Sequence, residues 1–299
     1  MTLRLALALA AVAAGLSTAL APAAPAFAQA APATVQAPLS LPATFAAGAT
    51  HVELSAPDGR KIELSVWPAA DERGVVVFSH GFNGSPGAYA RILSHWVDEG
   101  FTVAAPLHVD SLRHPDHAAY DGQAAFATRI ADLAVTRGFL KASRPGKPLI
   151  AAGHSFGSLM SFIGGGAVTV AGPLGDPDIK AIVAFSSAGD LQGVILPDTY
   201  AALRAPALMI TGDADLVPGY VADWHAHRSP FDRGAPGDKM LLVFAGADHS
   251  LVRNADAADF DLIGRTTTDF MKAHALADAA ARARLDALSA TDGVSLERR

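Results

Sequence analysis

The sequence predicts an α/β fold, a mostly parallel sheet of about eight strands with helices on both faces. Short runs rich in Val, Ile, Leu and Phe alternate with longer segments whose apolar residues recur at helical spacing. Several of the short runs are continuously apolar, which is typical of strands buried on both faces. The chain has 299 residues, of which 51% are hydrophobic, so it can bury a sizeable core.

Eight segments have the composition of strands. They are residues 51–55, 61–67, 74–79, 101–105, 148–153, 180–186, 206–212 and 239–246. The first two alternate apolar and polar side chains and flank Asp58-Gly59, a dipeptide typical of tight hairpins, so we expect an antiparallel pair at one edge. The other six are expected to be parallel, because helical segments separate most of them.

Helices are expected between these strands and near the C-terminal end. Their predicted segments are residues 85–99, 122–143, 155–166 and 218–228, with one or two more helices between about residues 255 and 290. Ser85-Pro86 begins the first helix and Gly100 ends it. The interval 187–205 is short, so little or no lid is expected over the ends of the strands.

The N-terminal region is expected to direct export. Arg4 is the only charge before a long run of Ala, Leu and Val, and Ala26-Phe27-Ala28 has small residues where a signal peptidase cuts. A membrane anchor is the alternative, but it needs about 20 uninterrupted apolar residues, and Pro22 and Pro25 interrupt this run. We therefore expect residues 1–28 to be a cleaved signal peptide of a secreted or periplasmic protein without a stable membrane anchor.

The rest of the chain is expected to form one domain. Residues 29–48 are rich in Ala and Pro and predict an extended leader, which leaves residues 49–299 for the domain itself. The chain has no cysteine, which excludes disulfides, thiolate metal sites and a cysteine nucleophile. Its formal net charge is −6, and no basic stripe occurs, so nucleic-acid binding is not expected.

Polar residues follow four of the predicted parallel strands. The segments are HGFNGSPG from residue 80, HSFG from residue 154, GDADLVP from residue 212 and GADHS from residue 246. Because the carboxyl ends of parallel strands meet at one edge of a sheet, we expect these segments to form one site. They bring together Ser155, either Asp213 or Asp215, and His249, in the chain order Ser, Asp, His.

Ser155 is a candidate nucleophile. It lies in Gly153-His154-Ser155-Phe156-Gly157, between a predicted strand and a predicted helix. The flanking glycines suit a strained turn in which side chains would collide with neighbouring elements, and the N-terminus of the helix favours developing negative charge. The alternative is a serine that caps the helix, but the three other loops favour the nucleophile.

The stretch VVVFSHGFNGSPGAYARILSHWVDEGFTVAAPLHVDS, residues 75–111, resembles the α/β-hydrolase superfamily. It is most similar to the branch with chlorophyllase, platelet-activating-factor acetylhydrolase, dienelactone-hydrolase-like esterases and bacterial polyester hydrolases. The resemblance covers essentially all of the chain from residue 52 and implies the α/β-hydrolase fold. Two features differ: dienelactone hydrolases proper use a cysteine, and polyester hydrolases often carry a disulfide near the catalytic His, whereas this chain has no cysteine.

The resemblance also implies roles for individual residues. It implies that His249 is the base, and the pattern Gly-x-x-Asp-x-x-Pro, here residues 212–218, selects Asp215 as the acid and leaves Asp213 to cap the turn. The backbone N–H groups of Phe82 and Phe156 would form the oxyanion hole.

Other aromatic residues and histidines near the motifs have less defined roles. Tyr89 and His154 are candidate substrate-lining residues, with burial inside the fold as the alternative. His225 and His227 lie on the predicted helix 218–228 and are expected at the surface. One loop holds three histidines and two aspartates: His108, Asp110, His114, Asp116 and His117. Because no fixed ligand spacing is recognisable in that loop, a role at the substrate rim or the surface is favoured over a metal site.

These features predict an exported serine hydrolase that cleaves carboxylic esters through an acyl-enzyme on Ser155. No cofactor is implied, and the partner would be a small-molecule or polymeric ester. An acyltransferase or amidase would use the same residues and differ only in the acceptor or the leaving group. A non-catalytic binding protein with this fold is the third interpretation, against which the ordered Ser, Asp and His argue.

Overall fold

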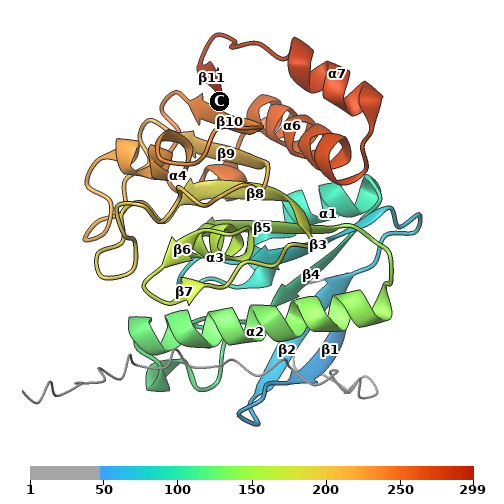
Figure 1. Ribbon diagram of the computed structural model, residues 1–299, viewed down its shortest axis with the longest axis vertical. Helices are drawn as coiled ribbons and strands as arrows, with labels where there is room; N and C mark the ends of the chain where they lie inside the picture. Colours follow the sequence, from blue (N-terminus) through green and yellow to red (C-terminus); the bar gives the residue numbers. More distant parts are fainter. Residues whose placement is uncertain (1–47) are drawn as a thin grey trace, which may run out of the picture.

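The structure is a computed structural model that describes residues 48–299, so the expected signal peptide and nearly all of the expected leader lie outside the described residues. A nine-stranded sheet crosses the described part of the chain (Figure 1). Its strands are β1 (Thr50–Ser55), β2 (Lys61–Trp67), β3 (Gly74–Ser79), β4 (Phe101–Pro106), β5 (Leu149–Ser155), β8 (Ile179–Ser187), β9 (Ala207–Gly212), β10 (Lys239–Phe244) and β11 (Val294–Arg298). A separate small hairpin consists of β6 (Val168–Thr169) and β7 (Gly172–Pro173).

Helices and short helical turns connect these strands. The longer helices are α1 (Ala90–Asp98), α2 (Gly122–Ser143), α3 (Phe156–Gly164), α6 (Ala257–Ala275) and α7 (Ala279–Ala287). The short ones are η1 (Pro86–Tyr89), η2 (His117–Ala119), η3 (Trp224–Arg228), α4 (Ser229–Asp232) and α5 (Leu251–Asn254). Aspartate side chains cap the first turns of α2, α6 and α7 by accepting backbone N–H bonds, which satisfies donors that a helix leaves free at its start.

The strand order is β1-β2-β4-β3-β5-β8-β9-β10-β11. The six strands from β4 to β10 in this order pair in parallel, whereas β1, β2 and β11 make antiparallel pairs at the two ends of the sheet. The sheet order reverses direction after β3, because β4 lies on one side of β3 and β5 on the other. The carboxyl ends of β3 and β5 are therefore neighbours, and a site can form there.

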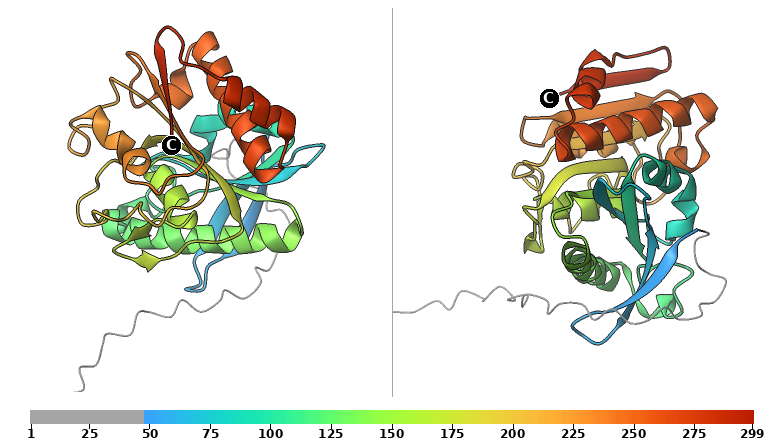
Figure 2. Two further views of the ribbon diagram at one scale, coloured as in Figure 1. Left: turned by 45° about the horizontal axis from the view of Figure 1, so that its top comes forward. Right: turned by 90° about the vertical axis from the view of Figure 1, so that its right-hand side faces the viewer.

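Two hydrophobic cores lie on the two faces of the sheet. Successive residues of β3 alternate between them: Val75 and Val77 pack with α2 and α3, whereas Val76 and Phe78 pack with α1, α6 and α7. Figure 2 shows α1 and α2 on opposite sides of the sheet. This burial of both faces explains why the central strands are continuously apolar.

All eight predicted strands are present, and the predicted fold class is confirmed. The prediction missed β11, a short strand that follows the Ala-rich helices and pairs with β10 from Phe244↔Val294 to Met240↔Arg298. The helix expected over 218–228 is wrong in its first half. There, Val217 and Val221 form a bridge around a turn in which Gly219 has a φ of 83°, and only η3 is helical.

No helix within residues 48–299 is both long enough and apolar enough to cross a membrane.

Strand β11 shields the edge of β10, whose backbone groups would otherwise be free to pair with another chain. A chain that ends at Asp292 is therefore expected to lose several degrees of thermal stability and to aggregate. Differential scanning fluorimetry and light scattering would measure both effects. The full-length Ser295→Ala variant, which keeps the strand pairing, serves as the control, and equal behaviour of the truncated and control proteins would contradict this role of β11.

Candidate active site

Ser155 lies at a strained turn between β5 and α3. Its φ of 53° and ψ of −120° are unusual for a residue with a side chain. A Cβ atom at Gly157 would overlap the carbonyl oxygen of Ser79, and one at Gly153 would overlap the carbonyl group of Gly157. Gly157 is therefore required by the close contact of this turn with the end of β3, and Gly153 by the tightness of the turn itself, as the sequence predicts.

The Ser155 side chain is partly exposed and does not cap α3. No hydrogen bond within residues 48–299 involves its hydroxyl group, and a Cβ atom on Gly81 would lie 3.5 Å from the Ser155 Cβ atom. The serine thus lies beside the turn that follows β3, with its hydroxyl group free for another partner.

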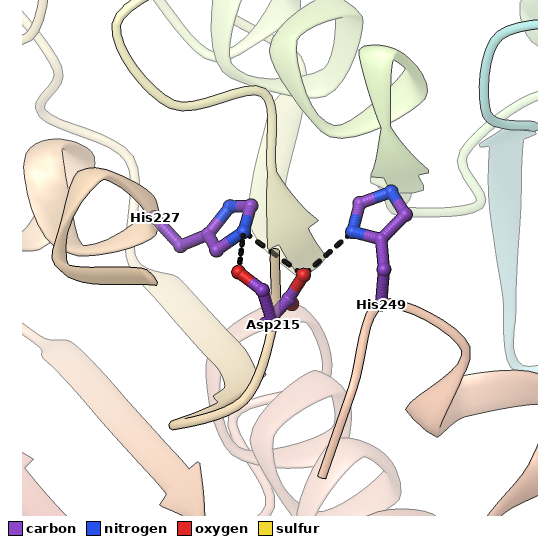
Figure 3. A group of neighbouring side chains, drawn as sticks. All are labelled: Asp215, His227 and His249. Carbon is purple, nitrogen blue, oxygen red and sulfur yellow. Dashed lines mark hydrogen bonds and ion pairs between the residues drawn. The ribbon is translucent and has the colours of Figure 1, made fainter. Parts of the chain in front are cut away.

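Asp215 and His249 meet in the loops after β9 and β10 (Figure 3). The His249 Nδ1 atom lies 2.7 Å from Asp215 Oδ1, and Thr211 donates a hydrogen bond of 2.7 Å to Asp215 Oδ2. The Asp215 side chain is fully buried, whereas His249 is partly exposed. Burial raises the pKa of Asp215, but hydrogen bonds from two histidines outweigh it and hold the pKa well below its usual range.

Asp213, the other candidate acid, lies elsewhere. Its exposed carboxylate accepts a hydrogen bond of 2.6 Å from the backbone N–H of Gly246, and so connects the loop after β9 to the loop after β10. The geometry therefore brings Asp215, and not Asp213, to His249.

The second histidine on Asp215 is His227, which the sequence prediction wrongly assigned to the surface. It is 1% exposed, and its Nε2 atom lies 2.9 Å from Asp215 Oδ1 and 3.0 Å from the Asp215 carbonyl oxygen. Its neighbour His225 is exposed as expected. Side chains two residues apart on a helix point in nearly opposite directions. The spacing of His225 and His227 therefore implies that one of them faces inward, but it does not say which one.

His154 connects the Ser155 turn to the loop that carries His249. The His154 Nε2 atom donates to the His249 carbonyl oxygen at 2.9 Å, and the two rings lie 4.6 Å apart between centroids. The Tyr89 hydroxyl lies 2.9 Å from His154 Nδ1 and accepts a bond of 3.1 Å from the Gly81 N–H. Both Tyr89 and His154 are 3% exposed, which favours the alternative in which they are buried inside the fold over a substrate-lining role.

The turn after β3 is held by an ion pair that was not predicted from the sequence. Arg129 is fully buried in α2 and donates to both carboxylate oxygens of Asp110 at 2.7 Å. It also donates to the carbonyl oxygens of His80 at 2.6 Å and Gly81 at 3.2 Å. Asp110 accepts from the N–H of Asn83 at 3.2 Å. Arg129 lies in the predicted helix at a spacing that places it with apolar neighbours, and a charge at such a position is the signal that could have found it.

Phe82 and Phe156, the expected oxyanion-hole residues, contact each other through their side chains. Their rings make an edge contact with centroids 6.1 Å apart, and the Phe82 side chain is 42% exposed. Phe156 is the first residue of α3, where a backbone N–H has no partner within the helix. The Phe82 N–H also has no hydrogen-bond partner among the residues that the structure describes.

The histidines of the loop at residues 108–117 lie in different surroundings. His108 is fully buried, and its Nε2 atom lies 2.8 Å from the Ser79 hydroxyl, so its expected place at the rim or surface is wrong. His114 and His117 remain at least partly exposed. Within residues 48–299, the residues grouped closely enough to hold a metal are Asp215, His227 and His249. Nitrogen atoms of both histidines lie at hydrogen-bond distances, 2.9 and 2.7 Å, from the same oxygen, Asp215 Oδ1. These contacts fit N–H···O hydrogen bonds between each histidine and the carboxylate.

Comparisons with known proteins agree with this architecture. Residues 70–197 match a family model described as serine aminopeptidase, S33, a segment that includes Ser155 but neither Asp215 nor His249. A search of curated protein sequences found no match.

Solved structures share the fold. An esterase from Pyrococcus furiosus has a TM-score of 0.60 at 18% identity, over 76% of this chain and 90% of that one. A dienelactone hydrolase from Anabaena variabilis has a TM-score of 0.58 at 14% identity, over 76% and 98%. A puromycin-hydrolyzing peptidase from Mycobacterium tuberculosis has a TM-score of 0.56 at 15% identity, over 76% of this chain but only 39% of the peptidase.

The buried histidines make stability depend on pH. Burial is the main cause that lowers the pKa values of His80 and His154 from 6.5 to about 3, so both stay neutral in the folded protein while they take up protons in the unfolded chain. Their stabilisation is present above the unfolded pKa and is lost as pH falls from about 6.5 toward 3. As the pH falls through this range, each of these residues should lower the free energy of unfolding by about 1.4 kcal/mol per pH unit.

Urea unfolding between pH 7.5 and pH 4 would measure this slope. The His154→Asn variant should show a shallower slope than the unmodified protein, because it lacks one of the buried histidines whose pKa is lowered. An unchanged slope in this variant would contradict the assignment of His154 as a buried neutral histidine.

Proposed function

From the geometry at its strand ends we propose that this chain, which has the α/β-hydrolase fold, is a serine hydrolase of carboxylic esters. The observation that carries the proposal is the hydrogen bond of 2.7 Å between buried Asp215 and His249, whose loop is joined through His154 to the strained turn of Ser155. His154 supports it further, because it directly precedes Ser155 and bonds to the His249 backbone.

In the proposed reaction, the Ser155 hydroxyl attacks the ester carbonyl carbon and gives its proton to His249 Nε2. Asp215 accepts from His249 Nδ1–H, which orients the ring and stabilises the imidazolium that forms. The N–H groups of Phe82 and Phe156 donate to the oxygen that becomes negative. His249 then protonates the leaving alcohol, and a water molecule that His249 deprotonates releases the acid from Ser155. No step needs a cofactor.

The turn after β3 has to be rigid for this reaction. One proposed oxyanion donor, Phe82, directly follows the two carbonyl groups that Arg129 binds. Because Arg129 and Asp110 are both buried and paired on two oxygens, the turn is fixed before a substrate arrives. Donors that are already in place stabilise a developing charge without reorganisation.

Amide hydrolysis is a second candidate for the same residues. The matched family model is described as a serine aminopeptidase, and an acyl-enzyme forms equally from an ester or an amide. Rates on 4-nitrophenyl butyrate and on 4-nitrobutyranilide, which release different leaving groups from one acyl group, would separate the two. A higher kcat/KM on the anilide would favour the amidase.

Export is also proposed, on the sequence of residues 1–28. N-terminal sequencing of protein recovered outside the cytoplasm should find a chain that begins after Ala28, and a chain that begins at Thr2 would contradict cleavage.

Replacement of the nucleophile tests the central proposal. Ser155→Ala should lower kcat for 4-nitrophenyl butyrate by at least about 10³-fold, because the acyl-enzyme cannot form. A fluorophosphonate probe should label the unmodified protein and not this variant. Ser143→Ala, at the far end of α2, should behave as the unmodified protein in both assays. Undiminished cleavage or labelling after loss of Ser155 would overturn the assignment.

The two neighbouring aspartates form a matched pair of variants. Asp215→Asn should reduce kcat by about 10³- to 10⁴-fold, because an amide cannot hold His249 in the same tautomer. Asp213→Asn should keep most of the activity, since an amide oxygen still accepts from the Gly246 N–H. Steady-state kinetics of both variants would measure the difference, and a larger loss in Asp213→Asn would reverse the assignment of the acid.

A further inference from the structure

His227 is bound in a way that differs from the other buried histidines. Its Nδ1 atom contacts the Ser187 carbonyl oxygen, and its Nε2 atom contacts the carboxylate and carbonyl oxygens of Asp215. A carbonyl oxygen only accepts hydrogen bonds, and so does an ionised carboxylate. Each ring nitrogen therefore needs a proton of its own, and a neutral ring would direct a lone pair at oxygen.

His80 and His154 show the contrast. The His80 Nε2 atom accepts from the His108 backbone N–H, and the Tyr89 hydroxyl, which accepts from Gly81, can donate to His154 Nδ1. Each of these rings therefore has a nitrogen that faces a donor and fits the neutral form. Only for His227, among these three buried rings, do both nitrogens face acceptors alone.

The Asp215 carboxylate has no free position for the extra proton. Its Oδ1 atom accepts from both His227 and His249, and its Oδ2 atom accepts from Thr211. Figure 3 shows the two rings on opposite sides of the carboxylate. A neutral imidazole has one ring proton and can donate from only one nitrogen. His227 faces acceptors with both nitrogens and therefore needs two ring protons.

From this geometry we propose that His227 is a buried imidazolium that positions Asp215 and offsets the negative charge that Asp215 presents to His249. The effect on His249 rests on the proposed function, whereas the protonation of His227 does not. His227 is a positioning residue, because it acts through Asp215 and touches neither Ser155 nor the proposed oxyanion donors in the described structure.

The surroundings of His227 agree with a cation. From the loop after β9 it faces the Asp215 carboxylate, from the end of β8 the Ser187 carbonyl group, and from the loop after β10 the His249 ring at 5.8 Å between centroids. On its own element, His225 pairs with Asp223, and Arg228 pairs with Asp232 and Glu297. Burial lowers the pKa of His227, but the hydrogen bonds and the charge of Asp215 outweigh it and raise the pKa.

A cation at this position has a definite consequence for the base. An unbalanced Asp215 carboxylate would attract a second proton to His249 and keep it protonated, and so inactive as a base, at mildly acidic pH. With His227 charged, part of that attraction is removed, and His249 is free to accept the serine proton at lower pH. Loss of the cation should therefore move the acidic limb of kcat/KM to higher pH.

NMR of the unmodified full chain tests the protonation state without any substrate. Two-bond ¹H–¹⁵N spectra of protein labelled in its histidine rings should show one histidine with both nitrogens protonated at pH 8, and His227→Gln should lack that signal. If this variant does not fold, nuclear Overhauser contacts to the His249 ring identify the signal in the unmodified protein. A spectrum in which His227 carries a single ring proton at pH 8 would overturn the proposal.

Kinetics then test the effect on His249. In His227→Gln the acidic limb of the pH profile for 4-nitrophenyl butyrate should move up by about one to two pH units, while the plateau falls less than in Asp215→Asn. His225→Gln, the same substitution at the exposed neighbour, should leave the profile unchanged. An unmoved limb in a folded His227→Gln would overturn the influence on His249.

The two failures are distinguishable. If the protein cleaves no ester or anilide, the proposed function fails, and the NMR measurement still decides whether His227 is charged.

Discussion

The contact between the Ser155 turn and the carboxyl end of β3 is the constraint on which the site depends. A side chain at Gly157 would overlap the Ser79 carbonyl oxygen, so the backbones of these two segments touch. This contact fixes the start of α3 beside the turn at residues 80–83. The turn is fixed in its own right by Arg129 and Asp110, which are buried behind it. The position of the serine relative to the turn is thus a property of the backbone and of one ion pair.

The other half of the site is organised around one buried carboxylate. Asp215 receives hydrogen bonds from groups in three places along the chain: Thr211 in β9, His227 in η3 and His249 after β10. A buried carboxylate is costly unless its oxygens are satisfied, and here both oxygens are. The same bonds that make the burial tolerable also hold the loops in position. The same hydrogen bonds therefore stabilise the fold and orient His249, and a substitution at any of the three donors should affect both stability and activity.

The sequence was sufficient for features that depend on local pattern and insufficient for those that depend on distant neighbours. Continuous apolar runs such as residues 74–79 identify buried strands, and the glycines around Ser155 identify the turn, because both signals are contained in a few adjacent residues. The inward orientation of His227 was missed, because the turn at Gly219 ends the periodicity on which the helix prediction relied. The pairing of Arg129 with Asp110 joins positions 19 residues apart, and no spacing rule relates them. Strand β11 is short, and its identity depends on the free edge of β10.

Strand β11 also bears on the order in which the protein can be completed during synthesis. Ribosomes add about 5–20 residues per second, and the parts of a chain fold from the N-terminal side as they emerge. β10, which directly precedes the loop of His249, obtains its outer partner only from residues 294–298, the last strand to be made. Until then the edge of β10 is open, so the region around that loop is completed only after the other strands of the sheet have been made. A chain that pauses before residues 294–298 emerge would display an unpaired strand edge to its surroundings.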